Sequence, residues 1–292
     1  MKDQAVTGHP GPKAVIIGRP ISHARSPLIH GYWLDQLEIE GIYERREVMP
    51  GAVSATLREL QDAGYAGGNV TVPHKEEAFA ACDDVTDRAR IAGAVNTFWF
   101  EGGRLHGDNT DGTGFVAHLS ETWPDWDCRP AEIRIIGAGG AARGLIAPLL
   151  DRNVKSISVS NRSRDRAEAL CRDIGAVLPD APLTILDWTH RGEHLETVDL
   201  LVNTTSMGMD GQPPLDIDLS TMRPSGIVAD IVYAPLETPL LASANRLGLK
   251  TLDGLGMLLH QAVPGFERWF GRRPSVTPAL RQHVFADLLG RH

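Results

Sequence analysis

The chain has 292 residues, which is long for a single hydrophobic core and favours two domains. Its net charge of −8 at pH 7 argues against a nucleic-acid partner, because phosphate binding requires a concentrated basic surface. With 42% hydrophobic and 23% charged residues it is typical of globular proteins, and no apolar run is long enough to cross a membrane.

Cysteines and histidines give little indication of a metal or redox site. Cys82, Cys128 and Cys171 lie far apart and show no ligand spacing. The N-terminal segment is polar and lacks the apolar stretch of a secretion signal, so a reducing cytoplasm is the expected location. His190 and His194 lie four positions apart, but the glycine between them favours a surface loop. No metal is expected.

In the first half of the chain, short apolar runs alternate with amphipathic stretches. Strands are expected at residues 14–17, 43–48, 68–72 and 94–100, and helices at 54–62 and 75–82. Ser26 and Pro27 predict the start of another helix, with Ser26 as N-cap and Pro27 as first helical residue. This alternation implies a mostly parallel sheet covered by helices.

A second unit begins at Ile133, after a break near residues 122–125. Its expected strands are 133–136, 157–159, 184–186, 200–202 and 227–232, and its helices include 164–174 and 239–247. From Gly254 onward only helical patterns occur, and such a tail often packs back on the first domain. We therefore expect one domain at residues 1–111, completed by 255–292, and a second at 112–254.

Glycines follow the first strand of this second unit. They form the sequence Gly-Ala-Gly-Gly-Ala-Ala at residues 137–142, between a strand and a helix, where a glycine fingerprint indicates dinucleotide binding rather than a plain turn. Gly137 permits a tight turn, and Gly139 lets the backbone approach a pyrophosphate at the helix N-terminus. The residues expected to contact the cofactor here are Gly137, Gly139, Gly140 and Ala141.

The next strand indicates which dinucleotide binds. It ends without the carboxylate that would hold the ribose 2′-hydroxyl of NAD, and continues instead as Asn161-Arg162-Ser163 with further arginines at 164 and 166. Guanidinium groups match a 2′-phosphate in charge and geometry. The alternative is a solvated helical turn, yet the helix dipole disfavours positive charge there. NADP(H) is therefore the expected cofactor, with Arg162 and Arg166 as phosphate ligands.

Four polar segments of the first half are expected at the carboxyl ends of strands or at the starts of helices. They are residues 22–27, 69–75, 93–97 and 107–112. Ligands bind at the carboxyl edge of parallel sheets. The hydroxyls, amides, ammonium and carboxylate of these segments suit a small polyhydroxylated acid better than an apolar ligand.

With these segments the chain resembles the shikimate dehydrogenase family, which reduces 3-dehydroshikimate to shikimate with NADPH in chorismate and aromatic amino-acid biosynthesis. The matching motifs run over nearly the whole chain, at residues 69–75, 93–97, 108–112, 137–141, 161–163, 203–209, 230–233 and 253–262. The resemblance implies an α/β fold with an N-terminal α/β substrate domain, a Rossmann-type NADP domain and C-terminal helices that return to the first domain. It also implies a small-molecule substrate and a monomer or homodimer.

The resemblance assigns roles to individual residues. Lys75 and Asp111 match the family's catalytic pair, which would stabilise and protonate the alkoxide left by hydride transfer. An ordinary ion pair is the alternative for these two residues. Met257 is implied near the nicotinamide, although a buried methionine is more often packing. The positions that surround the substrate ring in the family are Ser26, Asn69, Thr71, Asn96, Tyr233 and Gln261.

One position departs from the family pattern. The family usually holds the substrate carboxylate with Ser-x-Ser-Pro, and Ala24 occupies the first serine position here. A lost hydrogen bond to a charged group, about 1.5–3 kcal/mol, would weaken binding roughly tenfold or more unless another group replaces it. The alternatives are a quinate/shikimate or aminoshikimate dehydrogenase and a ligand-sensing domain of the same fold. The NADP pattern disfavours an NAD-linked quinate enzyme, and the Lys75–Asp111 pair disfavours a sensor.

Overall fold

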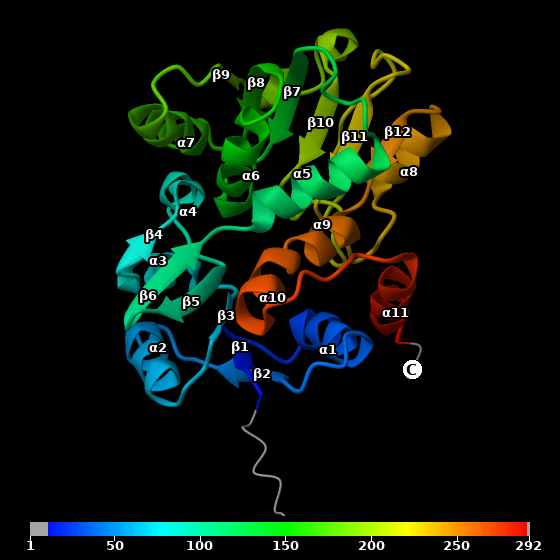
Figure 1. Ribbon diagram of the computed structural model, residues 1–292. Helices are drawn as coiled ribbons and strands as arrows, with labels where there is room; N and C mark the ends of the chain where they lie inside the picture. The colour runs from blue at the N-terminus through cyan, green and yellow to red at the C-terminus, as the bar shows by residue number, and fades with distance from the viewer. Residues whose placement is uncertain (1–10, 291–292) are drawn as a thin grey trace, which may run out of the picture.

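Two six-stranded sheets, each covered by helices, make up the part of the chain that the computed structural model describes, residues 11–290 (Figure 1). The α/β fold class is therefore confirmed. The long helix α5 (Asp111–Thr122) links one sheet to the other. Among residues 11–290 no helix combines the length and the apolar composition that crossing a bilayer requires.

The first sheet has the strand order β2-β1-β3-β5-β6-β4. Its strands are β1 (Lys13–Gly18), β2 (Ile42–Glu47), β3 (Gly67–Val70), β4 (Asp84–Val85), β5 (Thr97–Glu101) and β6 (Arg104–Asp108). All run in the same direction except β5, which is antiparallel to both neighbours. The start of β5 therefore lies at the edge of the sheet where β3 and β6 end.

Four helices accompany this sheet, namely α1 (Ser26–Gln36), α2 (Val53–Asp62), α3 (Lys75–Ala81) and α4 (Asp87–Ala92). The apolar strand β1 is buried between layers because Val15 and Ile17 pack with Leu57 of α2 and Phe98 of β5. The sequence analysis missed β4, β6 and α4. These elements are two to six residues long, and β6 (RLHGD) lacks an apolar alternation.

The second sheet has the order β12-β11-β10-β7-β8-β9 with every pairing parallel. Counted from β7, this is the strand order 3-2-1-4-5-6 of a Rossmann sheet, which binds dinucleotides where the order reverses. Its strands are β7 (Ala131–Ile136), β8 (Val154–Ser160), β9 (Leu183–Leu186), β10 (Leu200–Asn203), β11 (Ile227–Asp230) and β12 (Lys250–Leu252). Its helices are α6 (Gly140–Leu150), α7 (Arg164–Val177) and α8 (Pro239–Arg246), with short 3-10 turns at Trp188–His190 and Leu195–Thr197.

The C-terminal helices α9 (Gly254–His260), α10 (Val263–Phe270) and α11 (Pro278–Leu288) pack back on the first sheet, as expected. Trp269 of α10 donates its indole N–H to the carbonyl of Phe98 in β5 across 2.9 Å. Trp33, Phe266 and Leu280 share one buried cluster that joins α1, α10 and α11. The domain limits expected after residues 111 and 254 stay a prediction.

Candidate active site

A cavity of ≈ 420 Å³ opens at the edge of the first sheet where β3 ends and β5 begins. Both residues of the expected catalytic pair and all six expected substrate residues line it. The expected residues along its wall are Ser26, Asn69, Thr71, Lys75, Asn96, Asp111, Ala141, Tyr233, Met257 and Gln261. They come from segments scattered over the chain, so the tertiary fold is what brings them together.

One of the four polar segments reaches this edge in an unexpected way. The sequence analysis expected residues 93–97 to follow a strand or to begin a helix, and they do neither. Gly93 instead ends α4 with a left-handed backbone (φ 62°), and the segment then leads into β5. Because β5 is antiparallel to β3 and β6, its first residues meet the last residues of those strands. The expectation was wrong about the local structure, yet Asn96 reaches the same edge.

Lys75 and Asp111 lie side by side on the wall of the cavity. Each is the first residue of its helix, α3 and α5 respectively, and Lys75 Nζ donates to Asp111 Oδ2 across 2.5 Å. The lysine side chain is 30% exposed and the carboxylate 19% exposed, so a ligand can reach both. An ammonium group has three N–H donors, and Asp111 is its one partner among the described residues. The remaining donors can therefore hydrogen-bond an oxygen atom of a ligand.

A buried network fixes this pair in place. Asn96 donates its side-chain amide to Asp111 Oδ1 across 2.7 Å and, more weakly, to Gln261 Oε1 across 3.3 Å. Its own oxygen accepts the backbone N–H of Thr110 at 2.8 Å. The hydroxyl of Thr110 in turn donates to the carbonyl of Gln261 at 2.9 Å. Asn96 therefore caps the turn before α5 and also orients the carboxylate of Asp111.

Ser26 differs from its expected capping role. Arg25 is the N-cap of α1, and Ser26 is the first helical residue, buried on the cavity wall. The Ser26 hydroxyl is thus not engaged in capping and instead lies on the cavity wall beside the Tyr43 hydroxyl. Arg25 pairs with Asp287 of α11 at 2.5 Å, and the carbonyl of Ala24 accepts Arg45 Nη2 at 2.9 Å.

Tyr43 and His30 are two buried residues that support Asn69 of the site, and the sequence analysis missed both. The Tyr43 hydroxyl donates to Asn69 Oδ1 across 2.5 Å, and its ring stacks on His30 with centroids 4.0 Å apart. Burial raises the pKa of Tyr43 and lowers the pKa of His30 to about 3, so both rings are neutral near pH 7. A tyrosine within an expected strand carries no sequence signal for such a partner.

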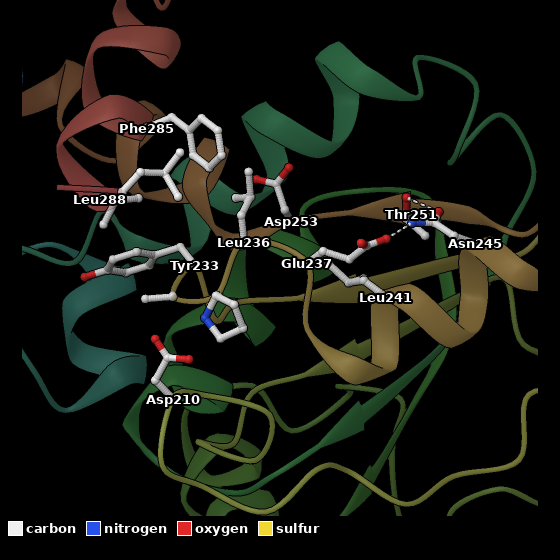
Figure 2. A pocket seen from close by; sticks show the side chains of 13 residues that line it. Asp210, Tyr233, Leu236, Glu237, Leu241, Asn245, Thr251, Asp253, Phe285 and Leu288 are labelled. Atoms are coloured by element: carbon white, nitrogen blue, oxygen red, sulfur yellow. Dashed lines mark hydrogen bonds between the residues drawn. The ribbon is translucent and has the colours of Figure 1, made fainter. Parts of the chain in front are cut away.

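A second cavity, of ≈ 550 Å³, lies where Tyr233 meets α11 (Figure 2). Figure 2 shows Phe285 and Leu288 of α11 on one side of it and Asp210 and Glu237 from loops of the second sheet on the other. Its charged lining residues are the carboxylates Asp210, Glu237 and Asp253. Negative charge of this kind repels an anionic ligand, so the smaller cavity is the better candidate for an acid substrate.

The glycine turn between β7 and α6 fits a bound pyrophosphate. Gly137 has a left-handed φ of 116°, and a Cβ there would lie 2.5 Å from Thr204 Oγ1. A Cβ at Gly139 or Gly140 would meet nothing within 4 Å, so the start of α6 faces open space. Gly139 is the N-cap and supplies no side-chain acceptor. The N–H groups of the first turn are therefore available to phosphate oxygens.

The segment after β8 extends this surface. Asn161 accepts the backbone N–H of Ala138 at 3.2 Å and donates to the carbonyl of Ser163 at 2.8 Å, which ties it to the glycine turn. Arg162 and Arg166 are exposed and have no ion-pair partner among residues 11–290.

Arg164 is different, because it pairs with Glu168 one turn along α7 at 2.8 Å. The chemistry of the two unpaired guanidinium groups suits a 2′-phosphate, whereas Arg164 is already neutralised.

The chain is similar to known proteins over most of its length. Family models match residues 16–98 (shikimate dehydrogenase substrate binding domain), 121–209 (shikimate/quinate 5-dehydrogenase) and 254–282 (shikimate 5′-dehydrogenase C-terminal domain). The shikimate dehydrogenase (NADP(+)) of Methylobacterium radiotolerans is 52% identical over 284 residues, 96% of this chain and 98% of the relative.

Two solved structures have nearly the same fold. One is shikimate 5-dehydrogenase from Thermus thermophilus in complex with NADP(H) and shikimate, 32% identical, with a TM-score of 0.80 over 95% of this chain and 99% of that chain. The other is quinate dehydrogenase from Corynebacterium glutamicum in complex with NAD, 28% identical, with a TM-score of 0.86 over 94% and 99%.

Proposed function

The chain belongs to the shikimate dehydrogenase family, and from this membership we propose that it reduces 3-dehydroshikimate to shikimate with NADPH, in aromatic amino-acid biosynthesis. The reaction is reversible, with NADP+ as oxidant. The observation that carries the proposal is the Lys75–Asp111 pair, 2.5 Å apart in a cavity of ≈ 420 Å³. A cavity of this volume with several polar side chains is typical of a site for a small polar ligand.

Lys75, positioned by Asp111, transfers the proton in the proposed reaction. When bound, NADPH supplies the hydride that reduces the ketone carbon. The Lys75 ammonium hydrogen-bonds the ketone oxygen, stabilises the negative charge that develops on it and passes it a proton. Asp111 holds the ammonium in position, since Asn96 fixes the opposite carboxylate oxygen. In the reverse direction Lys75 accepts the proton of the substrate hydroxyl.

The remaining polar residues of the cavity hold the substrate. The Ser26 hydroxyl binds the substrate carboxylate, because it lines the cavity and does not cap α1. The ring and its hydroxyls lie among hydrogen-bonding side chains on the other walls, which are Asn69, Thr71, Asn96, Tyr233 and Gln261. Burial raises the pKa of Tyr233, so its hydroxyl stays protonated and can donate.

The cofactor binds along the second sheet. The N–H groups at the start of α6 would hold the phosphates, and Arg162 with Arg166 would hold the 2′-phosphate. Met257 and Ala141, which line the catalytic cavity, would contact the nicotinamide. The full set of proposed cofactor residues is Gly137, Gly139, Gly140, Ala141, Asn161, Arg162, Ser163, Arg166 and Met257. The domain limits proposed with this function remain those expected from the sequence, with residues 1–111 and 255–292 assigned to the substrate domain and residues 112–254 to the cofactor domain.

Two further expectations accompany this function. A cytoplasmic location is in keeping with the free thiols of Cys82, Cys128 and Cys171. A monomer or homodimer stays a prediction.

The decisive experiment compares acids and cofactors on the purified protein. Oxidation of shikimate, quinate and aminoshikimate is followed with NADP+ and, in parallel, with NAD+. Shikimate with NADP+ should give the highest kcat/KM. A higher kcat/KM for quinate with NAD+ would replace this proposal by the quinate alternative. Tight shikimate binding without turnover would favour the ligand sensor.

A further inference from the structure

A second group of chemically active side chains lies where α5 packs against α9. His118 and Glu121 are three residues apart on α5, and His260 is the last residue of α9. One ligand atom from each of these residues lies within 4.8 Å of the other two. They border a cavity of ≈ 340 Å³ that shares no lining residue with the catalytic cavity.

One ring nitrogen of each histidine in this group lacks a hydrogen-bond partner among the described residues. His118 Nε2 and His260 Nε2 are both buried and have no hydrogen-bond partner within residues 11–290. His260 Nε2 lies 2.7 Å from Glu121 Oε2, but the direction of approach does not fit a hydrogen bond. Buried polar atoms without partners are costly, so an additional partner is expected between these side chains.

The packing around His118 holds its ring in place. A Cβ at Gly256 of α9 would lie 2.2 Å from the ring, so the glycine allows His118 to lie directly against the α9 backbone. The His118 and His260 rings stack with centroids 5.9 Å apart. Thr122 Oγ1 contacts His118 Nδ1 at 3.4 Å, which is the kind of outer contact that orients a metal-binding histidine.

The charges that face this cavity favour a cation. Arg281 of α11 is already paired with Asp253 at 2.6 Å, and within residues 11–290 the Glu121 carboxylate has no lysine or arginine partner. Burial lowers the pKa of His118 to about 4 and also lowers the pKa of His260, so both rings are neutral near pH 7. Two neutral imidazoles and a carboxylate are a donor set that zinc binds in other proteins.

We propose that His118, Glu121 and His260 bind a divalent transition-metal ion, with Zn²⁺ the best fit, which clamps α5 to α9. Zinc bonds of about 2.0–2.1 Å place tetrahedral ligand atoms about 3.3 Å apart. The three atoms reach this spacing by small side-chain rotations, for which Glu121 is free because its side chain is 60% exposed. The fourth position faces the cavity and takes a water molecule or a solute.

The position of the ion gives it a structural consequence. Helix α5 begins at Asp111, and α9 leads directly into Gln261. Both residues line the catalytic cavity, so the ion would stabilise two of its walls from outside. The expected effect is on stability, since Lys75 and Asp111 do not contact this group.

The test uses the full-length protein after treatment with a chelator. Zn²⁺ binding is measured by calorimetry and Co²⁺ binding by visible absorption. We expect one ion per chain, the intense Co²⁺ bands of tetrahedral coordination, and a melting temperature raised by roughly a few degrees at a zinc concentration of about 100 Kd. No rise in melting temperature together with no Co²⁺ bands would overturn the proposal.

Variants locate the ion. Glu121→Gln keeps an exposed side chain of the same size, so the fold should persist while the Kd for Zn²⁺ rises by at least about 10–100-fold, the loss that even outer-shell changes produce. His118→Gln should have the same effect. His194→Gln is the matched control, because His194 is an exposed histidine, 78% accessible, on another surface.

Wild-type zinc affinity in both Glu121→Gln and His118→Gln would contradict the site. Shikimate oxidation by each metal-free variant is measured in parallel. Unchanged turnover with lost zinc binding would support the metal site and leave the proposed catalytic function intact, so the two proposals fail separately.

Discussion

Asn96 donates its side-chain amide to Asp111 across 2.7 Å, and this contact decides how the carboxylate is used. Because Oδ1 of Asp111 accepts from Asn96, Oδ2 is the oxygen that faces Lys75. The amide comes from the segment before the reversed strand β5, and the carboxylate begins α5. The catalytic pair is therefore positioned by contact between the sheet edge and a helix start, and not by a local motif.

Replacement of Lys75 tests the catalytic assignment. Lys75→Ala should lower kcat by about 10²–10⁴-fold with a modest change in KM, because the group acts on charge that develops in the transition state. Steady-state kinetics with shikimate and NADP+ measure both constants. The surface variant Lys155→Ala, which breaks only an exposed ion pair with Glu132, should behave as wild type. A change in KM alone would make Lys75 a binding residue.

A serine at position 24 tests the departure from the family pattern. Ala24→Ser adds the hydroxyl that the family usually directs at the substrate carboxylate. One hydrogen bond to a charged group is about 1.5–3 kcal/mol, so the KM for shikimate should fall roughly tenfold. Ala24→Gly, which adds no donor, is the control. An unchanged KM in Ala24→Ser would mean that another group, such as Ser26 or the nearby Arg25, already satisfies the carboxylate.

Arginine variants test the preference for NADP. Arg162→Ala should raise the KM for NADP+ by roughly tenfold or more and leave the KM for NAD+ nearly unchanged, since only NADP+ carries the 2′-phosphate. Arg166→Ala should act in the same direction. Arg164→Ala is the matched control, because Arg164 is engaged with Glu168. Equal losses with both cofactors would point to a structural role for Arg162.

The pH dependence of stability tests the pKa of Asp230, the buried last residue of β11. Burial raises its pKa from 3.8 to about 6, against hydrogen bonds from Thr238, Asn203 and the Val232 N–H that favour the ionised form. The folded protein therefore binds this proton more tightly than the unfolded chain. The resulting stability is fully present below about pH 4 and is lost as the pH rises through about 6, on the order of 3 kcal/mol in total.

Asp230→Asn removes this titration. The free energy of unfolding of the variant should therefore fall less than that of the wild type between about pH 4 and pH 7. Urea unfolding at a series of pH values measures both slopes. Asp216→Asn is the control, because its side chain is fully exposed. Parallel pH profiles for wild type and Asp230→Asn would contradict the shifted pKa.

Substitution of Gly112 tests whether α5 must pack closely against α6. A Cβ at Gly112 would lie 2.1 Å from the backbone oxygen of Gly144, which cannot move aside as a flexible side chain could. Gly112→Ala should therefore lower the free energy of unfolding by about 1–3 kcal/mol. Gly175→Ala in α7, where a Cβ meets nothing within 4 Å, should instead be neutral or stabilising by up to about 1 kcal/mol. Denaturant unfolding distinguishes the two outcomes.

The sequence alone determined the features that depend on residues close together in the chain. The turn at Gly137, the arginines after Asn161 and five strands of the second sheet were predicted from local pattern, whereas the three-residue strand β12 was missed. They could be predicted because strand and helix periods, and the needs of a phosphate-binding turn, are set by near neighbours. Resemblance to a family added Lys75 and Asp111 as a pair.

Only the tertiary structure decided which distant groups meet. The antiparallel direction of β5 brings Asn96 to the sheet edge. Tyr43 on β2 reaches past β1 to Asn69 on β3. The packing of α5 against α9 brings His118 next to His260. None of these has a signature in spacing, because strand order and helix packing follow from burial of the whole apolar surface rather than from any one segment. The sequence determined the chemical groups, and the packing of the two sheets and their helices determined their partners.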